Sequence, residues 1–344
     1  MNTVIRAANL DTDRALLIEA HRHWLAPQSD ARRFDWLYRN SPHGQARAWI
    51  ATQGNEGSLV GAAAAFPRRL RVGGVAATGW VLGDFFVVPQ HRSLGPAVQL
   101  QRACLGAVDS KSAQFYYDFP AAAMLPVYSR LAVKPTARLV RFAKPLRLNS
   151  RRISKHVKPS FLVRGLTAIG NFTLESLDRR QPRPDACAIS LQAGPCGAEF
   201  TELSAAASVK HGICIERSAE YLNWRYRNHF CRHYEILTAR RDGKLLCFAV
   251  FTRDSENAEI TDLFGDESVL WELLTHTLSH LRRLGVLTVS APMLDSHRYA
   301  ARLARLGFRA RESCPVITNG LAADAGKAHL DSGTLFLMQG DRES

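Results

Sequence analysis

One five-residue motif occurs twice in the chain, once in each half. Trp-Leu-Tyr-Arg-Asn at positions 36–40 recurs as Trp-Arg-Tyr-Arg-Asn at positions 224–228, and the four identities include two of the rarest residue types. A second echo closes each half, because segment 128–133 (Tyr-Ser-Arg-Leu-Ala-Val) parallels segment 303–308 (Leu-Ala-Arg-Leu-Gly-Phe). Such self-similarity indicates an internal duplication. The sequence therefore predicts two similar domains in tandem.

Both halves have the pattern of an α/β domain, since a helix, a strand, a turn and a strand follow one another around each copy of the motif. In the first half, Asp11 is expected to cap a helix that runs to Trp24. The other elements expected there are a helix at 29–39, strands near 47–53, 58–68 and 80–88, a helix from 95 to about 110, a strand at 114–118 and a helix before 133. This alternation favours an α/β fold with a mixed sheet.

A basic segment joins the two halves. From Arg130 to Arg164 there are eleven Lys or Arg residues and no acid, and prolines surround an amphipathic stretch at Phe161–Leu177. Such a run is typical of a solvated face or linker, and an anionic partner (nucleic acid or membrane) is the alternative. We expect a first domain at 1–145, a basic linker with one helix at 146–185 and a second domain at 186–344.

Composition restricts the class of protein. Hydrophobic residues make up 46% and charged residues 22% of the chain, as in soluble globular proteins. The N-terminus has acidic groups where a signal peptide needs an apolar core, and no apolar run approaches the ~20 residues of a membrane span, so a cytoplasmic protein is expected. The seven cysteines form no C-x-x-C pair, which argues against a disulfide frame or a zinc site. The net charge of +14 would attract phosphates of several kinds of partner.

The residues from Gly83 to Leu100 are expected to form a strand, a short turn and the start of a helix. The first four amides of a helix lack internal partners and lie at the positive end of its dipole, so a pyrophosphate placed there gains hydrogen bonds and a favourable field. Gly95 and Ala97 leave room for a close approach. The segment is therefore suited to hold the phosphates of a cofactor.

Arg92-x-x-Gly95-x-Ala97, placed after a strand and a proline, resembles the coenzyme A loop (Gln/Arg-x-x-Gly-x-Gly/Ala) of the GNAT acyltransferase superfamily. The resemblance implies two GNAT-like domains, with acetyl-coenzyme A (acetyl-CoA) as co-substrate and no metal. It also implies that backbone groups of Phe86, Val87 and Val88 pair with the pantetheine arm. The residues implied to hold the pyrophosphate are Arg92, Ser93, Leu94, Gly95, Pro96 and Ala97. Pro96 has no N–H, so this cradle has one donor fewer.

The resemblance also implies candidate catalytic residues. Tyr128 stands where the superfamily commonly has a tyrosine that protonates the departing thiolate, and a neutral phenol suits that task. Asp84 is the nearest carboxylate on the expected cofactor strand, and it would face the cleft as a base if the bulge seen in the family is present. His91 is the alternative base, since an ordinary imidazole titrates near ~6.5.

The second half departs from the family pattern at both places. Residues 260–269 contain carboxylates and no Arg-x-x-Gly-x-Ala, and Leu303 stands where the first half has Tyr128. We therefore expect a folded domain that binds no cofactor and that shapes the acceptor site or holds the pair together.

The expected activity is N-acetyl transfer from acetyl-CoA to a primary amine of a small molecule or of a sugar or polysaccharide precursor. Peptidoglycan-bridge aminoacyltransferases also pair two such domains and use aminoacyl-tRNA, but they generally lack the Arg-x-x-Gly-x-Ala pattern. A non-catalytic module that docks its basic segment on nucleic acid or membrane is the third possibility, although the chain has no recognised nucleic-acid motif. The acceptor, the acyl chain length and the oligomeric state stay open.

Overall fold

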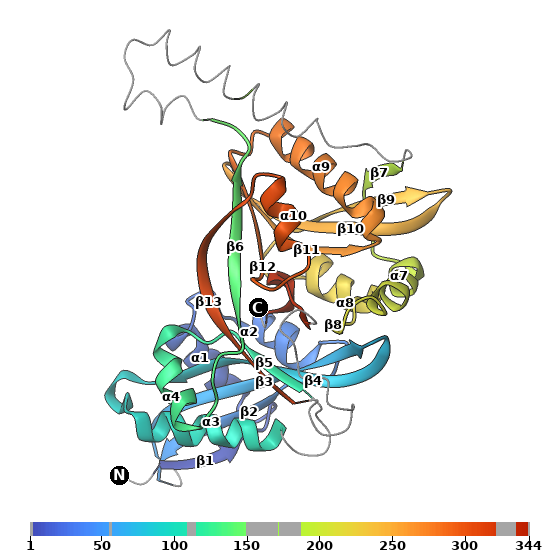
Figure 1. Cartoon of the computed structure of the whole chain (residues 1–344). Helices are drawn as coiled ribbons and strands as arrows, with labels where there is room; N and C mark the ends of the chain where they lie inside the picture. The colour runs from blue at the N-terminus through green and yellow to red at the C-terminus, as the bar shows by residue number, and fades with distance from the viewer. Residues whose placement is uncertain are drawn as a thin grey trace, which may run out of the picture.

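The computed structural model of the chain describes residues 3–54, 57–108, 115–148, 171, 187–320 and 335–342. It has two lobes, each built mainly from one half of the chain, which lie one above the other in Figure 1. Apart from residue 171, the predicted helix at Phe161–Leu177 lies outside the described residues, as does most of the predicted linker. The domain limits at 145 and 186 therefore stay predictions.

The first lobe is a sheet with helices on both faces. Its elements are β1 (Thr3–Ala7), α1 (Arg14–Trp24), α2 (Ala31–Phe34), the π-helical turn η1 (Asp35–Arg39), β2 (Arg47–Gln53), β3 (Leu59–Val72), β4 (Val75–Val87), η2 (Pro89–His91), α3 (Leu94–Val108), β5 (Phe115–Asp118), η3 (Ala122–Met124), α4 (Leu125–Arg130) and β6 (Ala137–Pro145). The expected elements are all present. Asp11 does not cap α1, because the helix begins three residues later and the Asp11 carboxylate is paired with Arg39 at 2.5 Å.

The second lobe follows the same plan. Its elements are β7 (Ala188–Leu191), α7 (Ala198–Ser208), β8 (Ile213–Ile215), α8 (Ala219–Leu222), the π-helical turn η4 (Asn223–Arg227), β9 (Glu235–Arg241), β10 (Lys244–Arg253), β11 (Asn257–Gly265), α9 (Glu267–Arg283), β12 (Thr288–Leu294), α10 (Ala300–Arg305), β13 (Arg309–Gly320), β14 (Leu335–Phe336) and η6 (Gln339–Asp341). The α/β class with a mixed sheet is confirmed.

The two lobes share strands. The strand order is β1-β2-β3-β4-β5-β13-β6-β12-β11-β10-β9-β7, so one sheet runs through the whole molecule. β6 comes from the first half but pairs with β12 of the second, and β13 comes from the second half but pairs through Ile317–Gly320 with β5 of the first. In Figure 1 these two long strands run between the lobes. The halves are therefore joined by exchanged strands as well as by the chain itself.

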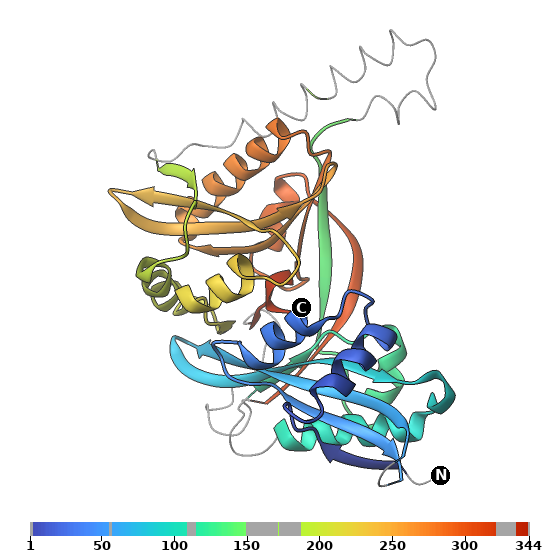
Figure 2. The same ribbon diagram turned by 180° about the vertical axis from the view of Figure 1, so that it is seen from behind.

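The two copies of the motif meet between the lobes. The rings of Trp36 and Trp224 are stacked, with centroids 4.6 Å apart and planes 14° from parallel. Each indole N–H donates to the backbone carbonyl of the other tryptophan, at 2.9 and 2.8 Å. Reciprocal contacts of this kind define a local two-fold relation between the halves. In Figure 2 the two helical segments that contain the motifs, α2 with η1 in blue and α8 with η4 in yellow, face one another across the boundary.

Each copy of the motif forms one π-helical turn. The amides of Asn40 and Asn228 donate to the carbonyls of Asp35 and Asn223, five residues earlier, which widens the turn. The second echo is structural too, because Ala132 and Gly307 hold the same place after α4 and α10 and both have a left-handed φ, 58° and 89°. The repeat detected in the sequence is therefore a repeat of local backbone geometry.

We predict that Trp224→Ala destabilises the protein by about 3–5 kcal/mol, because it removes a buried ring, the stack and the hydrogen bond that the Trp224 indole donates across the lobe boundary. The free energy of unfolding in urea measures the loss. Val75→Ala is the control, since Val75 is 70% exposed and its truncation should change that free energy by less than about 0.5 kcal/mol. Equal effects of the two changes would contradict a structural role for the stack.

Candidate active site

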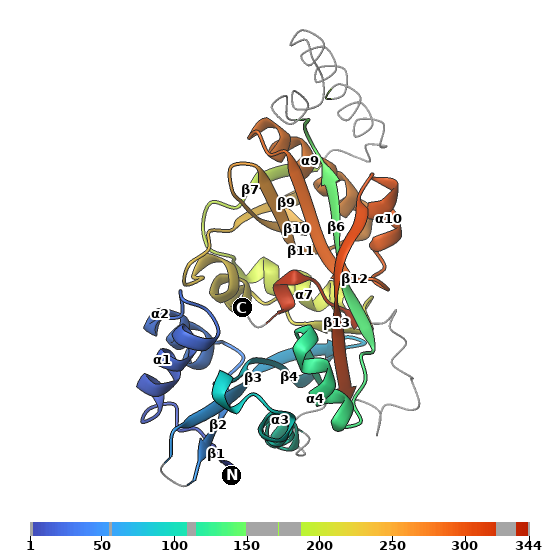
Figure 3. The same cartoon turned by 90° about the vertical axis from the view of Figure 1, so that its left-hand side faces the viewer.

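Two neighbouring strands of the first lobe diverge. β4 and β5 pair in parallel only over Gly79–Val81 and Phe115–Tyr117, and then β5 ends at Asp118 while β4 continues to Val87. The split between them (the β4/β5 split) opens at the end of β4, where the chain turns into α3. Figure 3 shows α3 and α4 on one side of this sheet and α1 and α2 on the other.

The loop that was predicted to hold pyrophosphate lies at this opening. Arg92, Ser93 and Gly95 are exposed, Leu94 and Pro96 are half-buried, and Ala97 is buried. A Cβ added to Gly95 would meet no atom within 4 Å, so the start of α3 is open to a ligand. His91 lies in η2, half-buried and away from the strand.

The three residues predicted to pair with pantetheine face different ways. The Phe86 carbonyl lies against β3, because a Cβ on Gly61 would come within 2.4 Å of it. The Val88 amide also points to β3, where it donates to Val60 at 2.9 Å. The Val87 carbonyl accepts a hydrogen bond of 3.2 Å from Arg92 Nε. Of these three groups, only the Val87 carbonyl faces away from β3.

β4 carries the bulge on which the Asp84 assignment depended. Its register with β3 shifts between Phe86 and Gly83, which leaves one extra residue on β4. Asp84 lies in this bulge with a φ of 46°, a left-handed conformation that non-glycine residues adopt rarely. Its side chain is thereby directed toward α1, α2 and η1, where its partners lie.

The Asp84 carboxylate is held on several sides. Arg33 binds both of its oxygens, at 2.6 and 2.8 Å, Tyr38 donates to it at 2.9 Å, and His21 Nδ1 lies 4.0 Å away. Its side chain is only 6% exposed. Burial by itself raises the pKa of Asp84, but the charge and hydrogen bonds of its partners, chiefly Arg33, lower that pKa to about 2. Asp84 is therefore a permanent anion engaged by its neighbours.

The second lobe contains the same arrangement. Asp262 precedes the end of β11 by the three residues that separate Asp84 from the end of β4. Its carboxylate accepts a hydrogen bond of 3.2 Å from Tyr226, the counterpart of Tyr38 in the repeated motif, and is paired with the fully buried Arg217 at 2.9 Å. The shared Asp-x-Phe in the two strands was a sequence signal that the motif analysis had not used.

Tyr128 lies on the other face of the sheet, wholly buried under α3. Its hydroxyl donates to an oxygen of Asp118, the last residue of β5, in a short hydrogen bond, and accepts a bond of 2.9 Å from Gln101 of α3. Burial, and then the Asp118 carboxylate, raise the pKa of the Tyr128 phenol well above its usual value. The sequence analysis missed Asp118 and Gln101. Asp118 could have been proposed from the sequence, because it ends a strand of aromatic residues close in the chain to Tyr128, the candidate acid.

In the second lobe, the helix start and the strand split that correspond to the predicted cofactor site are both occupied by groups of the protein itself. The Asp266 carboxylate caps α9 by accepting the Ser268 amide at 3.0 Å, so the helix start is occupied by the protein's own anion. In the split between β11 and β12, Met338 bridges to Met293 and the Leu337 carbonyl accepts a bond from Leu294. This C-terminal segment (335–342) is held in place because Asp341 is paired with buried Arg217 at 3.0 Å.

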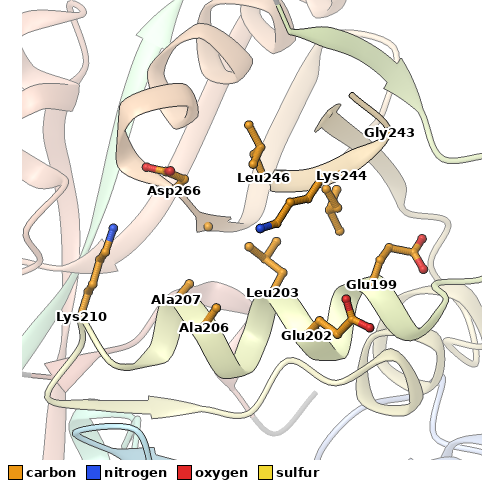
Figure 4. Close-up of a pocket in the computed structure, with 12 residues that line it drawn as sticks. Glu199, Glu202, Leu203, Ala206, Ala207, Lys210, Gly243, Lys244, Leu246 and Asp266 are labelled. Atoms are coloured by element: carbon orange, nitrogen blue, oxygen red, sulfur yellow. The ribbon is translucent and has the colours of Figure 1, made fainter. Parts of the chain in front are cut away.

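Two cavities of similar size lie outside the β4/β5 split. One, of about 510 Å³, separates α7 from the start of β10, and Figure 4 shows Lys210 and Lys244 pointing into it over an apolar floor that includes Leu203. The other, of about 500 Å³, combines residues of both halves, from Leu125 at the start of α4 to Asp295 beyond β12. Either could hold a small polar ligand.

Among the residues that the structure describes, no group of three or more His, Cys, Asp and Glu side chains is arranged to hold a metal ion. None of the helices described is long and apolar enough to cross a membrane.

A family model described as an acetyltransferase (GNAT) domain matches residues 9–133. None of the curated proteins matches the chain significantly. Among solved structures, a GCN5-related N-acetyltransferase from Anabaena variabilis is similar at 12% identity and a TM-score of 0.67, over 92% of this chain and 72% of its own. An Enterococcus faecalis protein of unknown function, described as a probable N-acyltransferase, has 10% identity and a TM-score of 0.66, over 93% and 73%. Saccharomyces cerevisiae N-myristoyltransferase with bound myristoyl-CoA has 12% identity and a TM-score of 0.55, over 92% and 79%.

We predict that Arg33→Gln destabilises the protein by about 3–5 kcal/mol at neutral pH, because it leaves the buried Asp84 carboxylate without its cation. With a folded-state pKa of about 2, below the ~3.9 of an unfolded aspartate, Asp84 stabilises the fold above about pH 4, and this contribution is lost as the pH falls through about 2. In Arg33→Gln, burial without the cation raises the folded-state pKa of Asp84 above its unfolded value, so protonation favours the folded state and the destabilisation should shrink as the pH falls.

Urea unfolding between pH 7 and pH 3 measures both effects. Arg32→Gln is the matched control, since Arg32 pairs with Asp30 while its side chain is 78% exposed, and such a pair contributes about 0–1 kcal/mol. A stability loss in Arg33→Gln that is equally large at pH 7 and at pH 3 would contradict the arrangement described.

Proposed function

The chain carries a GNAT-type acyltransferase domain, as its coenzyme A loop predicted, and from this premise we propose that the first lobe transfers an acetyl group from acetyl-CoA to a primary amine. The acceptor in this proposal is a small molecule or a sugar or polysaccharide precursor. The observation that carries it is the β4/β5 split, with an open helix start at one end and a tyrosine–carboxylate pair beside it.

The chain's own groups would bind the cofactor as follows. The open amides at the start of α3, with Arg92, would hold the pyrophosphate at the positive end of the helix dipole. The Val87 carbonyl would accept a hydrogen bond from the pantetheine arm, in exchange for its present bond from Arg92. Bound acetyl-CoA supplies a thioester that is already activated toward amines, so the protein's contribution is to position the reactants and to move protons.

Tyr128 is assigned as the proton donor to the departing thiolate. The phenol carries its proton at neutral pH, and Gln101 donates to its oxygen, an interaction that strengthens as the oxygen gains charge. Asp84, the predicted base, lies on the opposite face of the sheet, where its carboxylate is bound by Arg33 and sets the shape of the bulge.

The second lobe would help form the acceptor site. Its cofactor split is filled by the C-terminal segment, so a second acetyl-CoA has no equivalent place to bind. The cavity between Leu125 and Asp295 takes residues from both halves and includes a carboxylate suited to attract an amine. We propose this cavity as the entrance for the acceptor.

We predict that acetyl-CoA binds at one site per chain and that Gly95→Glu abolishes the binding, because the new side chain places bulk and negative charge where the pyrophosphate would lie. Isothermal titration calorimetry measures both. Gly106→Glu is the matched control, since Gly106 is exposed in the same helix and its added Cβ also meets no atom within 4 Å.

Two equivalent sites, or full affinity in a folded Gly95→Glu protein, would contradict the assigned loop. Binding of aminoacyl-tRNA without any binding of acetyl-CoA would favour the aminoacyltransferase alternative.

We predict that Tyr128→Phe lowers kcat by roughly 10²- to 10⁴-fold and leaves the Kd of acetyl-CoA unchanged, because only the proposed proton donor is removed. Steady-state kinetics with a panel of primary amines, followed by thiol release, measures the change. Leu303→Ala at the matching place of the second lobe should cost about 2–5 kcal/mol of stability, since Leu303 is fully buried, with little change in turnover. Full activity in Tyr128→Phe would make the tyrosine a packing residue.

A further inference from the structure

We infer that Asp118 is the carboxylate that receives the amine's proton, and that it works as a unit with Tyr128 to carry that proton to the departing thiolate. The inference deepens the proposed acetyl transfer and rests on it. It changes the assignment of the base from Asp84, on β4, to the residue that ends β5 on the other side of the split.

Comparison of the two lobes separates structural from chemical carboxylates. The parallel strand pairs identify Ala291 of β12 as the counterpart of Asp118. Val81 and Glu259 correspond, because each lies three residues before the equivalent aspartate, Asp84 or Asp262. Tyr117 lies opposite Val81 and Ser290 lies opposite Glu259, so the residues that follow, Asp118 and Ala291, also correspond. The lobe without a coenzyme A loop has thus lost both members of the pair, with Ala291 and Leu303 in place of Asp118 and Tyr128. It has kept the counterpart of Asp84.

The retained carboxylate has the properties of a structural group. Asp84 and Asp262 each bind a buried arginine and the tyrosine of the repeated motif, in the active and in the degenerate lobe alike. Their common role is to tie β4 and β11 to the motif of their own lobe. A carboxylate whose two oxygens both bind an arginine is a poor proton acceptor near neutral pH.

Asp118 has the geometry that proton transfer needs. It is half-buried at the end of the strand that borders the split, and one of its oxygens already receives the Tyr128 hydroxyl. The groups that face Tyr128 from the elements packed on it are Asp118 and Tyr116 of β5 and Cys104 and Gln101 of α3. Burial, and then the charge of Asp118, raise the pKa of the Cys104 thiol.

The pair accounts for the timing of the proton transfers. While Asp118 is ionised, its charge opposes ionisation of Tyr128, so the phenol does not release its proton early. The acceptor attacks as the neutral amine, after its ammonium form has lost one proton to solvent. As the amine nitrogen bonds to the acetyl carbon, a second proton moves from the nitrogen to Asp118, and the opposing charge disappears. Tyr128 then gives its proton to the sulfur as the carbon–sulfur bond breaks, and the Asp118 proton passes to the phenolate. The amine proton is thereby transferred to the thiol, and both residues return to their initial state.

The experiment compares Asp118→Asn, Asp118→Glu and Asp84→Asn with the wild type. Each protein is assayed with acetyl-CoA and the same panel of primary amines, across the pH range in which the fold is stable, and its acetyl-CoA affinity is measured by calorimetry. Asparagine keeps an oxygen that can accept the Tyr128 hydroxyl, so a purely structural role for Asp118 would survive this substitution.

We expect Asp118→Asn to lower kcat by roughly 10²- to 10⁴-fold at unchanged acetyl-CoA affinity, and to remove the acidic limb of the pH profile of kcat/KM. Asp118→Glu should recover part of the rate. The double variant Asp118→Asn, Tyr128→Phe should be no slower than the slower single variant, because residues that act as a unit are not additive. In Asp84→Asn, the acidic limb should remain.

Other results overturn the inference in distinguishable ways. Wild-type activity with an intact acidic limb in Asp118→Asn overturns the relay and leaves acetyl transfer standing. Loss of the acidic limb in Asp84→Asn returns the base to Asp84. If the wild type binds no acetyl-CoA, or transfers acetyl to no amine of the panel, the proposed function fails and the relay fails with it.

Discussion

The stacked pair of Trp36 and Trp224 is the contact through which one half of the molecule positions the other. Each indole satisfies its N–H on the backbone of its partner, so neither ring can be moved without leaving a buried donor unpaired. The π-helical turns make this possible. Because the amides of Asn40 and Asn228 bond five residues back, the carbonyls of Trp36 and Trp224, four residues back, are left to accept from the indoles. The motif residue two places further on, Tyr38 or Tyr226, then binds the aspartate of the β4-type bulge in its own lobe. The lobe boundary and the two bulges are thus parts of one connected arrangement.

Duplication followed by divergence explains where charge is buried. Both lobes keep an arginine against the bulge aspartate, but in the second lobe Arg217 binds a further carboxylate, that of Asp341. This added pair holds the C-terminal segment in the split that the first lobe leaves to a cofactor. Tyr117 of the first lobe donates to the Asp341 backbone at 2.7 Å, so the segment contacts both lobes. The split of the second lobe is in this way part of the packing between lobes.

The sequence predicted what local signals encode: the duplication, the elements of the first half and the loop at Arg92, where strand, proline and glycine follow in order. It could not identify the partners of Asp84, because Arg33 and Tyr38 are 51 and 46 residues away in the chain and only the fold unites them. It missed Asp118, which is only 10 residues from Tyr128, because the spacing alone does not show that the two side chains meet. The sequence could not predict the exchange of β6 and β13 either, because a strand pattern indicates that a segment is a strand but not which strand lies beside it in the sheet.

The exchanged strands have a consequence for how the protein is made. The outer neighbour of β5 is the end of β13, at Ile317–Gly320, so the sheet of the first lobe lacks a strand until almost the whole chain has left the ribosome. During synthesis the edge of β5 is exposed, and an uncovered strand edge invites pairing with other nascent chains. The N-terminal lobe, although translated first, is therefore completed only when residues 317–320 have been made, and its biogenesis depends on a late segment that a chain truncated before β13 would not supply.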